Sequence, residues 1–428
     1  MKMTVAPAPH LRRVGLVIAV ASLVAISFAT LSPEPGSAVG SHLCLVCGSL
    51  GVVNAVLNVF LFVPLGIGLA FIGFPGKRAV LAMFALSALI ETAQFLVIPG
   101  RYSTIGDVLT NTLGGVLGFA VGRYAFTLLR PSPRIAVALC IGWSAVWLTV
   151  QTISAFGFSP AMPTSEYYGQ IAPRLRNFEQ FCGRVLRANI ADVAVPDTRF
   201  KDSAHVRELL LRGAIVTTTI VVPARPTGDI APIVRLADAS QREIALLAQN
   251  GDNLVFGVRT GAAVLRLRPP FFALSDVFPA VSPRDSGLTT DTLTVSARYS
   301  AREVWMNTQM RTSHDRRIRI AVSLGWTMLL PFQWFIEGTR VELALSAVWI
   351  ACLLLPIGYW GVGVARFPRA ENATRIWTTA ILIALVLLLV GLVAVPHAFG
   401  TTAAPPSDWL AALTGILLGG ALAPRVST

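Results

Sequence analysis

The sequence predicts a polytopic α-helical membrane protein of about eight or nine membrane segments, into which an all-β domain is inserted. Hydrophobic residues occupy 54% of the 428 positions and charged residues only 13%, which excludes an ordinary soluble globular protein. Apolar runs long enough to cross a hydrocarbon core about 30 Å thick recur toward both ends of the chain. Between them, short runs of alternating polar and apolar residues predict antiparallel β structure.

Nine apolar segments have the length and composition of membrane helices. They are Val14–Leu31, Val52–Phe71, Ala79–Ile98, Val108–Leu129, Ile135–Phe156, Ile318–Ile336, Leu343–Val364, Trp377–Val395 and Trp409–Leu422. The chain thus divides into an N-terminal membrane domain (1–156), an extracytoplasmic β-sandwich (157–315) and a C-terminal membrane domain (316–428). An uncleaved anchor, rather than a cleaved signal peptide, is expected at the N-terminus.

The net charge of +13 comes from basic residues that are scattered beside the apolar segments rather than gathered into one stripe. Those of the first region include Arg12, Arg13, Lys77, Arg78, Arg130 and Arg134. Their placement fits the positive-inside rule if the first helix runs outward. We therefore expect no nucleic acid partner. Nearly all the basic residues are arginines, which we attribute first to coding bias and second to phosphate recognition.

The β region contains one clear hairpin, with Arg242–Gln249 and Leu254–Arg259 as its strands and an Asn-Gly turn between them. About 150 residues suffice for a β-sandwich with its own core. The strand rhythm and the segment Ile230–Thr260 resemble the concanavalin A-like, or laminin G-like, jelly roll. That resemblance implies carbohydrate or protein binding, and sometimes glycan hydrolysis. Glu243 and Asp252 flank the hairpin, but we interpret them as solvated charges rather than a catalytic pair.

Polar residues inside the N-terminal membrane segments are the main candidates for function. They are Asn58, Glu91, Gln94, Asp107 and Asn111, and a charge in hydrocarbon costs at least several kcal/mol. Glu91 and Gln94 share one helix face, as do Asp107 and Asn111. If the hairpin Pro99–Asp107 is outside, Asn58, Glu91 and Asn111 lie roughly 9, 10 and 6 Å below the outer helix ends. The sequence therefore predicts one polar layer in the outer leaflet.

Neighbouring residues support this layer. Arg101 is a candidate counter-ion for Glu91 or Asp107, and Pro64 is expected to kink its helix and free a carbonyl group. Three glycines, Gly66, Gly114 and Gly118, are expected to let helices pack closely.

Three interpretations of the layer remain open. The polar groups hold helices together, each interhelical hydrogen bond contributing about 0.6 to 2 kcal/mol. Alternatively they line a polar cavity that binds a lipid-linked or amphiphilic headgroup. In the third interpretation they form an acid–base enzyme, with Glu91 as acid or Asp107 as base. No cofactor and no metal site are expected.

This ordered set of residues resembles the VanZ-like family, which is named for a protein associated with resistance to the glycopeptide teicoplanin. The residues are Asn58, Pro64, Gly66, Glu91, Gln94, Arg101, Asp107, Asn111, Gly114, Gly115 and Gly118. The resemblance covers roughly Val14–Gly122. It implies a bacterial inner-membrane protein, with membrane lipid and a cell-wall glycan or lipid-linked precursor as partners, and it transfers no catalytic role.

The C-terminal membrane region partly repeats the first. Leu355–Gly358 corresponds to Val63–Gly66, and Asp408–Gly419 to Asp107–Gly118, while Pro396 corresponds to Pro99. Ala412 stands opposite Asn111, and nothing matches Glu91 or Gln94. Internal repeats are common in transporters. The degenerate second copy makes a transporter the third functional hypothesis, after a binding protein and an enzyme.

The segment that follows the β region bears on the membrane topology of the C-terminal part. If Ile318–Ile336 spans the membrane, Arg366 and Arg369 fall outside, against the positive-inside rule. We therefore favour a re-entrant or interfacial course for this segment, which Pro331 interrupts.

Cys44 and Cys47 form a C-x-x-C on the predicted outer side, where a disulfide is the first expectation. Free thiols, and redox or metal chemistry, are the alternatives.

Overall fold

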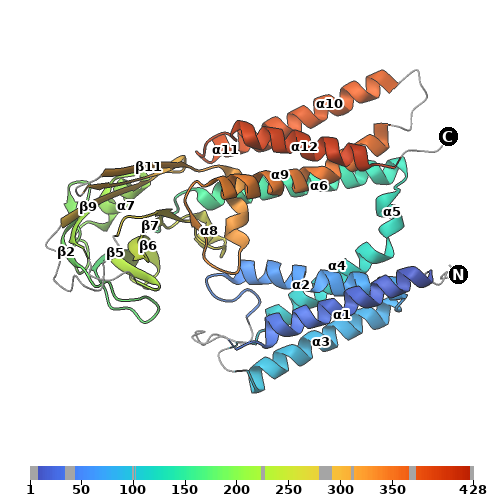
Figure 1. Cartoon of the computed structure of the whole chain (residues 1–428), viewed down its shortest axis with the longest axis horizontal. Helices are drawn as coiled ribbons and strands as arrows, with labels where there is room; N and C mark the ends of the chain where they lie inside the picture. The colour runs from blue at the N-terminus through green and yellow to red at the C-terminus, as the bar shows by residue number, and fades with distance from the viewer. Residues whose placement is uncertain are drawn as a thin grey trace. The chain divides into compact units, whose positions relative to one another are not determined.

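The computed structural model describes residues 8–33, 44–98, 101, 103–222, 227–278, 292–309, 313–365 and 373–424. The chain divides into two compact units, residues 1–138 with 424–428 and residues 139–423, and each is described by itself. Within the described residues, seven helices are long and apolar enough to cross a membrane. Together with two β-sheets in the middle of the chain, they confirm the predicted fold class (Figure 1).

The first unit is built from four long helices and one short one. They are α1 (Pro9–Leu31), α2 (Gly51–Ile72), α3 (Gly76–Leu96), α4 (Ile105–Arg123) and α5 (Ala125–Leu129). Helix α2 packs between α1 and α4, and α3 packs against α4. Gly73, with φ of 87°, ends α2, and the next helix begins three residues later. Such short connections make α2 and α3 antiparallel neighbours.

Helices α2 and α4 approach each other at three glycines. A Cβ atom on Gly114 would overlap the carbonyl oxygen of Val59, and one on Gly118 would overlap that of Val63. Gly66 faces the carbonyl oxygen of Gly115 in the same way. The two backbones therefore touch, as small residues in membrane helices permit. Pro64 lies inside α2, which continues through it.

The second unit contains α6 (Pro133–Phe158), which enters it from the first, α9 (Arg340–Ala365), α10 (Ala373–Leu389) and α12 (Pro406–Leu422). A π-turn and the short α11 (Val395–Ala398) follow α10. Helices α6, α9 and α12 run side by side around Trp147, which is fully buried (Figure 1). Helix α12 has only 17 residues.

Helices α9 and α12 repeat the packing of α2 on α4. Gly415 lies against the carbonyl oxygen of Ala351 and Gly419 against that of Leu355, while Gly358 lies against that of Ile416. These glycines stand at the positions that the sequence repeat pairs with Gly114, Gly118 and Gly66. Pro396 is buried in α11, and its counterpart Pro99 lies outside the described residues.

The segment Ile318–Ile336, included among the nine apolar segments, is not a membrane-spanning helix. It contains the end of β11 (Ser313–Arg319), a 3-10 helix (η1, Val322–Leu329) and β12 (Phe335–Ile336). Its 3-10 helix is largely buried against protein: Gly325 packs on Ser154 of α6, and the indole nitrogen of Trp326 donates to Ser346 of α9 at 3.1 Å. Arg366 and Arg369, which bear on the topology, lie outside the described residues.

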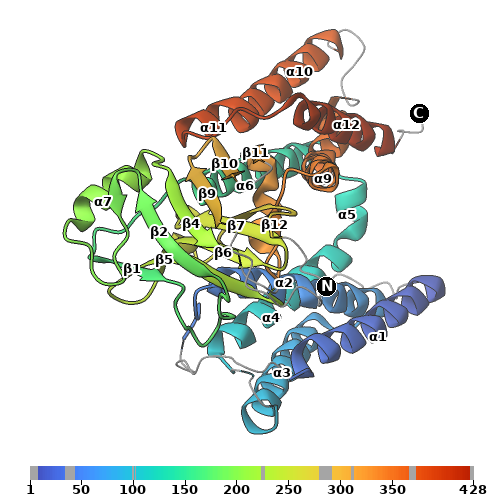
Figure 2. The same cartoon turned by 60° about the vertical axis from the view of Figure 1, so that its left-hand side comes forward.

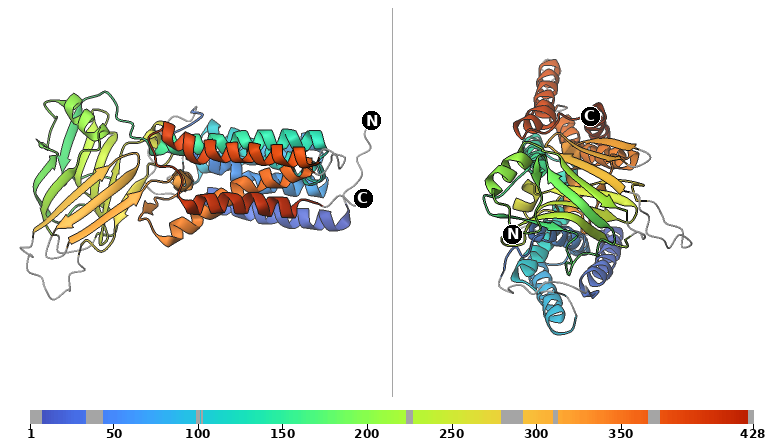
Figure 3. Two further views of the ribbon diagram at one scale, coloured as in Figure 1. Left: turned by 90° about the horizontal axis from the view of Figure 1, so that it is seen from above. Right: turned by 90° about the vertical axis from the view of Figure 1, so that its left-hand side faces the viewer.

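Two six-stranded sheets form the β region. The first has the order β1 (Tyr167–Ile171), β5 (Ile230–Asp238), β6 (Glu243–Asn250), β7 (Asn253–Val258), β8 (Phe271–Leu274) and β12. The second has the order β11, β10 (Glu303–Gln309), β9 (Thr292–Tyr299), β4 (Val216–Val221), β2 (Arg184–Ile190) and β3 (Val193–Ala194). Two short helices, α7 (Ser203–Leu211) and α8 (Gly261–Val264), accompany them. The sheets lie face to face as two layers (Figures 2 and 3).

The core between the sheets follows the alternation in the sequence. Along β9 every second side chain, from Leu293 to Tyr299, is buried. The ring of Tyr299 meets that of Phe272 edge to face, with centroids 5.8 Å apart. The predicted hairpin is present as β6 and β7. Gly251 lies in the turn between them and has a positive φ of 62°. Strand β6 is buried on both faces, since Leu246 and its neighbours are covered by partly buried residues that include Phe178 and Phe335.

The close approach of α2 and α4 predicts a selective effect of adding one methyl group. Gly118→Ala should lower the stability by about 1–3 kcal/mol, because the new Cβ overlaps a backbone oxygen that cannot move alone. Gly142→Ala in α6 is the matched control, because its Cβ would have no neighbour within 4 Å. The melting temperature of each purified variant in detergent, compared with that of wild type, measures the change in stability. Equal melting temperatures for the two variants would contradict the packing argument.

The β5–β6 turn depends on one buried carboxylate, Asp238, which is 1% exposed. One oxygen accepts from the backbone nitrogens of Ser240 and Arg242, both at 2.9 Å, and the other accepts from the Arg242 guanidinium at 2.7 Å. Burial by itself would raise the pKa of Asp238, but these hydrogen bonds and the charge of Arg242 outweigh it, so the pKa is lowered. The ionised form therefore stabilises the turn.

Asp238→Ala should cost about 2–3 kcal/mol at pH 7, because it removes the charged acceptor of two backbone N–H groups and of the Arg242 guanidinium. Since the folded pKa lies below the ordinary value of about 3.9, this stabilisation is present above pH 4 and is lost as the pH falls through the folded pKa. The difference in melting temperature between wild type and variant should therefore be largest at pH 7 and shrink as the pH falls below 4. Asp192→Ala, an exposed turn carboxylate, is the control and should melt like wild type.

Candidate functional site

A continuous hydrogen-bonded chain links α2, α4 and α3 near one end of the first unit. The side-chain nitrogen of Asn58 donates to Asp107 Oδ1 at 2.7 Å. The Thr104 hydroxyl lies 2.7 Å from Asp107 Oδ2, and the Thr104 backbone nitrogen donates to Glu91 Oε2 at 3.0 Å. Glu91 is 6% exposed, whereas Asn58 and Asp107 are half-buried. Three predicted residues are thus brought together through Thr104.

Helix α4 begins in this network for a local reason. Thr104 is its N-cap, and the Thr104 hydroxyl accepts from the backbone nitrogen of Asp107 at 3.1 Å. This hydrogen bond satisfies one of the free N–H groups at the helix start. The positive end of the helix dipole also stabilises the negative charge of Asp107. Sequence reasoning missed Thr104, although Thr-x-x-Asp before an apolar run is a capping-box-like pattern that predicts it.

Asn111 lies one turn deeper in α4 than Asp107. Its side-chain nitrogen donates to the Ser87 hydroxyl of α3 at 3.0 Å, and both residues are buried. The other amide atom, Oδ1, is buried and has no hydrogen-bond partner among the described residues. A buried amide oxygen without a donor costs about 1–3 kcal/mol. Asn111 therefore offers an acceptor to a ligand or to water.

Gln94 and Arg101 bind the end of α1. Gln94 donates to the carbonyl oxygen of Thr30 at 2.8 Å. The Arg101 guanidinium donates to the carbonyl oxygens of Ala29, at 2.8 Å, and Ser32, at 3.0 Å. The last carbonyl groups of a helix have no partner within it, and a cation there is favourable. Beyond the counter-ion role predicted for it, Arg101 thus secures the α1 terminus.

A disulfide joins Cys44 and Cys47, whose Cα atoms are 5.7 Å apart. The carbonyl oxygen of Cys44 accepts from the backbone nitrogen of Gly106 at 3.2 Å, and Gly106 packs directly on Leu45. The disulfide loop therefore lies against the first turn of α4, next to Asp107. His42, which is near these cysteines in sequence, lies outside the described residues.

The chemistry of this polar layer is that of two carboxyl groups connected through one threonine, with amide groups on either side. Most of its donors and acceptors are used by the chain's own atoms, which is what helix association in hydrocarbon requires. No cluster of three or more His, Cys, Asp or Glu suited to a metal ion occurs in the described part of the chain. Asn111 Oδ1 is the buried acceptor of the layer that has no donor among the described residues, and Asn58 and Asp107 are half-buried.

Glu243 and Asp252 in the β region lie at opposite ends of β6. Seven strand residues separate Glu243 from the turn, which places the two carboxylates roughly 25 Å apart. Paired glycosidase carboxylates are about 5 to 9.5 Å apart. Glu243 lies instead beside the buried guanidinium of Arg235, at 3.8 Å. The two do not form a hydrolytic pair.

Comparison with known proteins bears on the first unit. Residues 13–129 match the family model described as VanZ/LLP1. This segment is VanZ-like. The match includes every residue of the polar layer and confirms the predicted resemblance for this part of the chain, while the β region and the C-terminal helices lie outside it. No curated protein and no solved structure shows a significant match to the chain.

The VanZ-like segment allows a direct measurement of its interhelical hydrogen bond. Asn58→Ala and Asp107→Ala should each destabilise the protein, and the double variant should lose less than their sum, with a coupling of about 0.6 to 1.7 kcal/mol. Thr112→Ala is the matched control, since its hydroxyl bonds within α4 to Val108. Asn58 and Thr112 should show no coupling in melting experiments, and additive losses at 58 and 107 would contradict the bond.

Proposed function

We propose that this VanZ-like protein is an integral membrane binding protein of the bacterial cell envelope. Its polar layer holds the head of an amphiphilic or lipid-linked ligand at the outer face, and its β region binds an envelope glycan, without turnover. The observation that carries this proposal is the buried Asn111 Oδ1, which has no donor among the described residues, below the half-buried Asn58 and Asp107. A sugar hydroxyl or an amide N–H of a headgroup supplies the missing donor.

Depth along the helices supports this proposal. Asn58 follows the start of α2 by seven residues, Glu91 precedes the end of α3 by five and Asn111 follows the start of α4 by six. At about 1.5 Å per residue, all three lie within about 10 Å of a helix end. Lipid headgroups and the upper acyl chains occupy this depth, so the layer suits a molecule that is half polar and half apolar.

Charge supports the outward orientation. Lys77 and Arg78 follow the α2–α3 connection, and Arg130 and Arg134 lie around the start of α6. Both groups are at the opposite helix ends from the polar layer, and the positive-inside rule assigns such ends to the cytoplasm. The layer then faces outward from the inner membrane, and so does the β region. Handling of a cell-wall precursor, and through it of teicoplanin-type glycopeptides, fits this placement.

An enzyme acting on a lipid-linked substrate is the second candidate. The observation that favours it is the connection of Glu91 and Asp107 through Thr104, because two linked carboxyl groups can exchange a proton with a substrate. A transporter is less favoured, since Ile350 and Ala412 stand where a symmetric second site would need Asn58 and Asn111. Glu91→Gln and Asp107→Asn distinguish the first two functions: both abolish turnover in an enzyme, whereas a binding protein keeps part of its affinity.

Mass spectrometry of molecules that copurify with the protein tests the proposal. Wild type should retain an amphiphile or wall fragment, and Asn111→Ala should retain at least several-fold less, because one hydrogen bond to a buried acceptor is lost. Thr112→Ala, on the same helix, should retain as much as wild type. Equal retention by both variants, or none by wild type, would contradict ligand binding in the polar layer and leave helix association as the role of the layer.

A further inference from the structure

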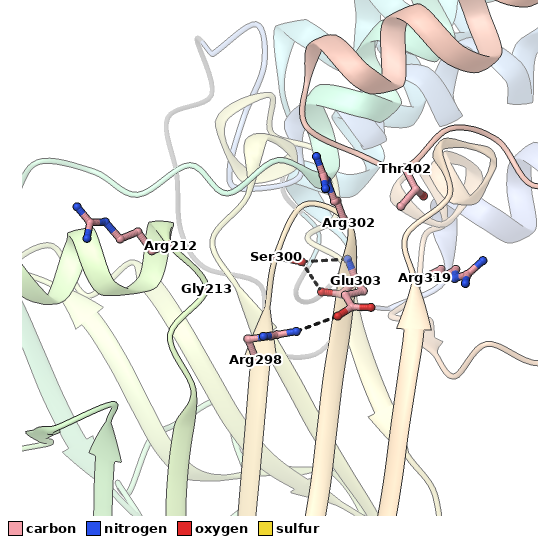
Figure 4. A pocket seen from close by; sticks show the side chains of 8 residues that line it. All are labelled: Arg212, Gly213, Arg298, Ser300, Arg302, Glu303, Arg319 and Thr402. Carbon is pink, nitrogen blue, oxygen red and sulfur yellow. Dashed lines mark hydrogen bonds and ion pairs between the residues drawn. The ribbon is translucent and has the colours of Figure 1, made fainter.

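The second unit contains a cavity of about 550 Å³ that is lined mostly by polar and charged side chains (Figure 4). Its residues come from the end of α7, the β9–β10 turn, the end of β11 and the connection between α11 and α12. The Thr402 hydroxyl of that connection donates to the carbonyl oxygen of Ile320 at 2.7 Å, which ties the helices to β11. The volume is in the usual range for small-molecule sites, about 300–1,000 Å³.

Arginine dominates the charge of this cavity. Its lining contains Arg212, Arg298, Arg302 and Arg319, and a single carboxylate, Glu303. Two of the four guanidinium groups are neutralised: Arg298 pairs with Glu303 at 2.8 Å, and Arg212 pairs with Glu208. For Arg302 and Arg319, both exposed, the structure describes no ion pair within the residues it covers. Two positive charges therefore remain available to an anion.

The turn between β9 and β10 holds these groups in place. The Ser300 hydroxyl bonds the backbone of Glu303 at both its nitrogen, at 3.1 Å, and its oxygen, at 3.0 Å. Glu303 in turn fixes Arg298, whose buried Nε atom has no partner among the described residues. Figure 4 shows Arg302 extending upward from this turn and Arg319 extending to the right from the end of β11. The turn thus presents an unused donor and a free charge to the same cavity.

The cavity lies at the end of the membrane helices of its own unit. The Tyr299 hydroxyl, at the base of the β9–β10 turn, donates to the carbonyl oxygen of Phe158, the last residue of α6, at 2.7 Å. Ser159 bonds the carbonyl oxygen of Phe399, just past α11, at 3.0 Å. Helices α9 and α12 begin at this end as well. The arginines are therefore at the level where apolar helices give way to water.

We propose that this cavity binds a phosphate group, with Arg302 and Arg319 as the residues that contact it. The planar guanidinium fork matches phosphate oxygens, and arginines at a membrane surface attract anionic headgroups. The source is either the headgroup of an anionic phospholipid or a soluble phosphate. This site is separate from the polar layer of the VanZ-like segment, and neither proposal depends on the other.

Calorimetric titration of the full-length protein in an uncharged detergent tests the proposal. Three probes are used: short-chain phosphatidylglycerol, short-chain phosphatidylcholine, and inorganic diphosphate. Phosphatidylglycerol should bind, and phosphatidylcholine, which has no net charge, should bind much more weakly. Diphosphate binding as tightly as phosphatidylglycerol would assign the site to a soluble phosphate, and much weaker diphosphate binding would assign it to a lipid. If neither anion binds, the proposal is wrong.

Paired substitutions locate the binding. The double variant Arg302→Gln with Arg319→Gln should lower the affinity for the anion that binds by about thirtyfold, at about 1 kcal/mol for each arginine. Arg184→Gln with Arg187→Gln, which removes the same charge from exposed positions of β2, should change it by less than about twofold. Arg302→Gln alone, at an exposed turn position, guards against misfolding of the double variant and should weaken binding about fivefold. Equal losses in the Arg302/Arg319 and Arg184/Arg187 variants would show general surface attraction and overturn the site.

Discussion

Backbone contact between α2 and α4 is the constraint on which the polar layer depends. Hydrocarbon supplies no water to polar groups, so each must find its partner in the protein. The glycines at 114 and 118 bring α4 onto the carbonyl oxygens of Val59 and Val63. Because helical side chains lean toward the N-terminus, Asn58, next to Val59, then reaches Asp107 in the first turn of α4. A wider helix separation would deprive the Asp107 carboxylate of its hydrogen bond from Asn58 and leave it only its bond to Thr104.

The second unit shows the same packing without the same chemistry. Helices α9 and α12 touch through Gly358, Gly415 and Gly419, so close packing does not require a polar layer. Ile350 and Ala412 are fully buried at the positions corresponding to Asn58 and Asn111. Asp408 keeps the place of Asp107 and is also buried, with one oxygen lacking a partner in the described residues. Close packing of two helices therefore does not by itself require the amide groups that the first unit has at these positions.

The sequence predicted the helices and the positions of the polar residues along them because hydropathy and helical rise are local properties. It did not predict the acceptors of Arg101, which belong to α1 some seventy residues earlier in the chain. Ile318–Ile336 was included among the membrane segments because hydropathy does not distinguish burial in lipid from burial in protein. Trp326 shows the difference: its ring packs on Trp334 and its nitrogen bonds Ser346 of α9.

That buried segment also determines where the arginine cavity lies. Arg319 ends β11, and the chain enters η1 three residues later, against the ends of α6 and α9. On the other side, Thr402 bonds Ile320 from the connection that leads into α12. The β-sheets of this unit are thus joined to its helices through packed protein rather than through a flexible linker. A domain on a long linker samples many heights above a membrane, whereas these contacts hold the arginines at one level, where a phosphate group at the bilayer surface can meet them.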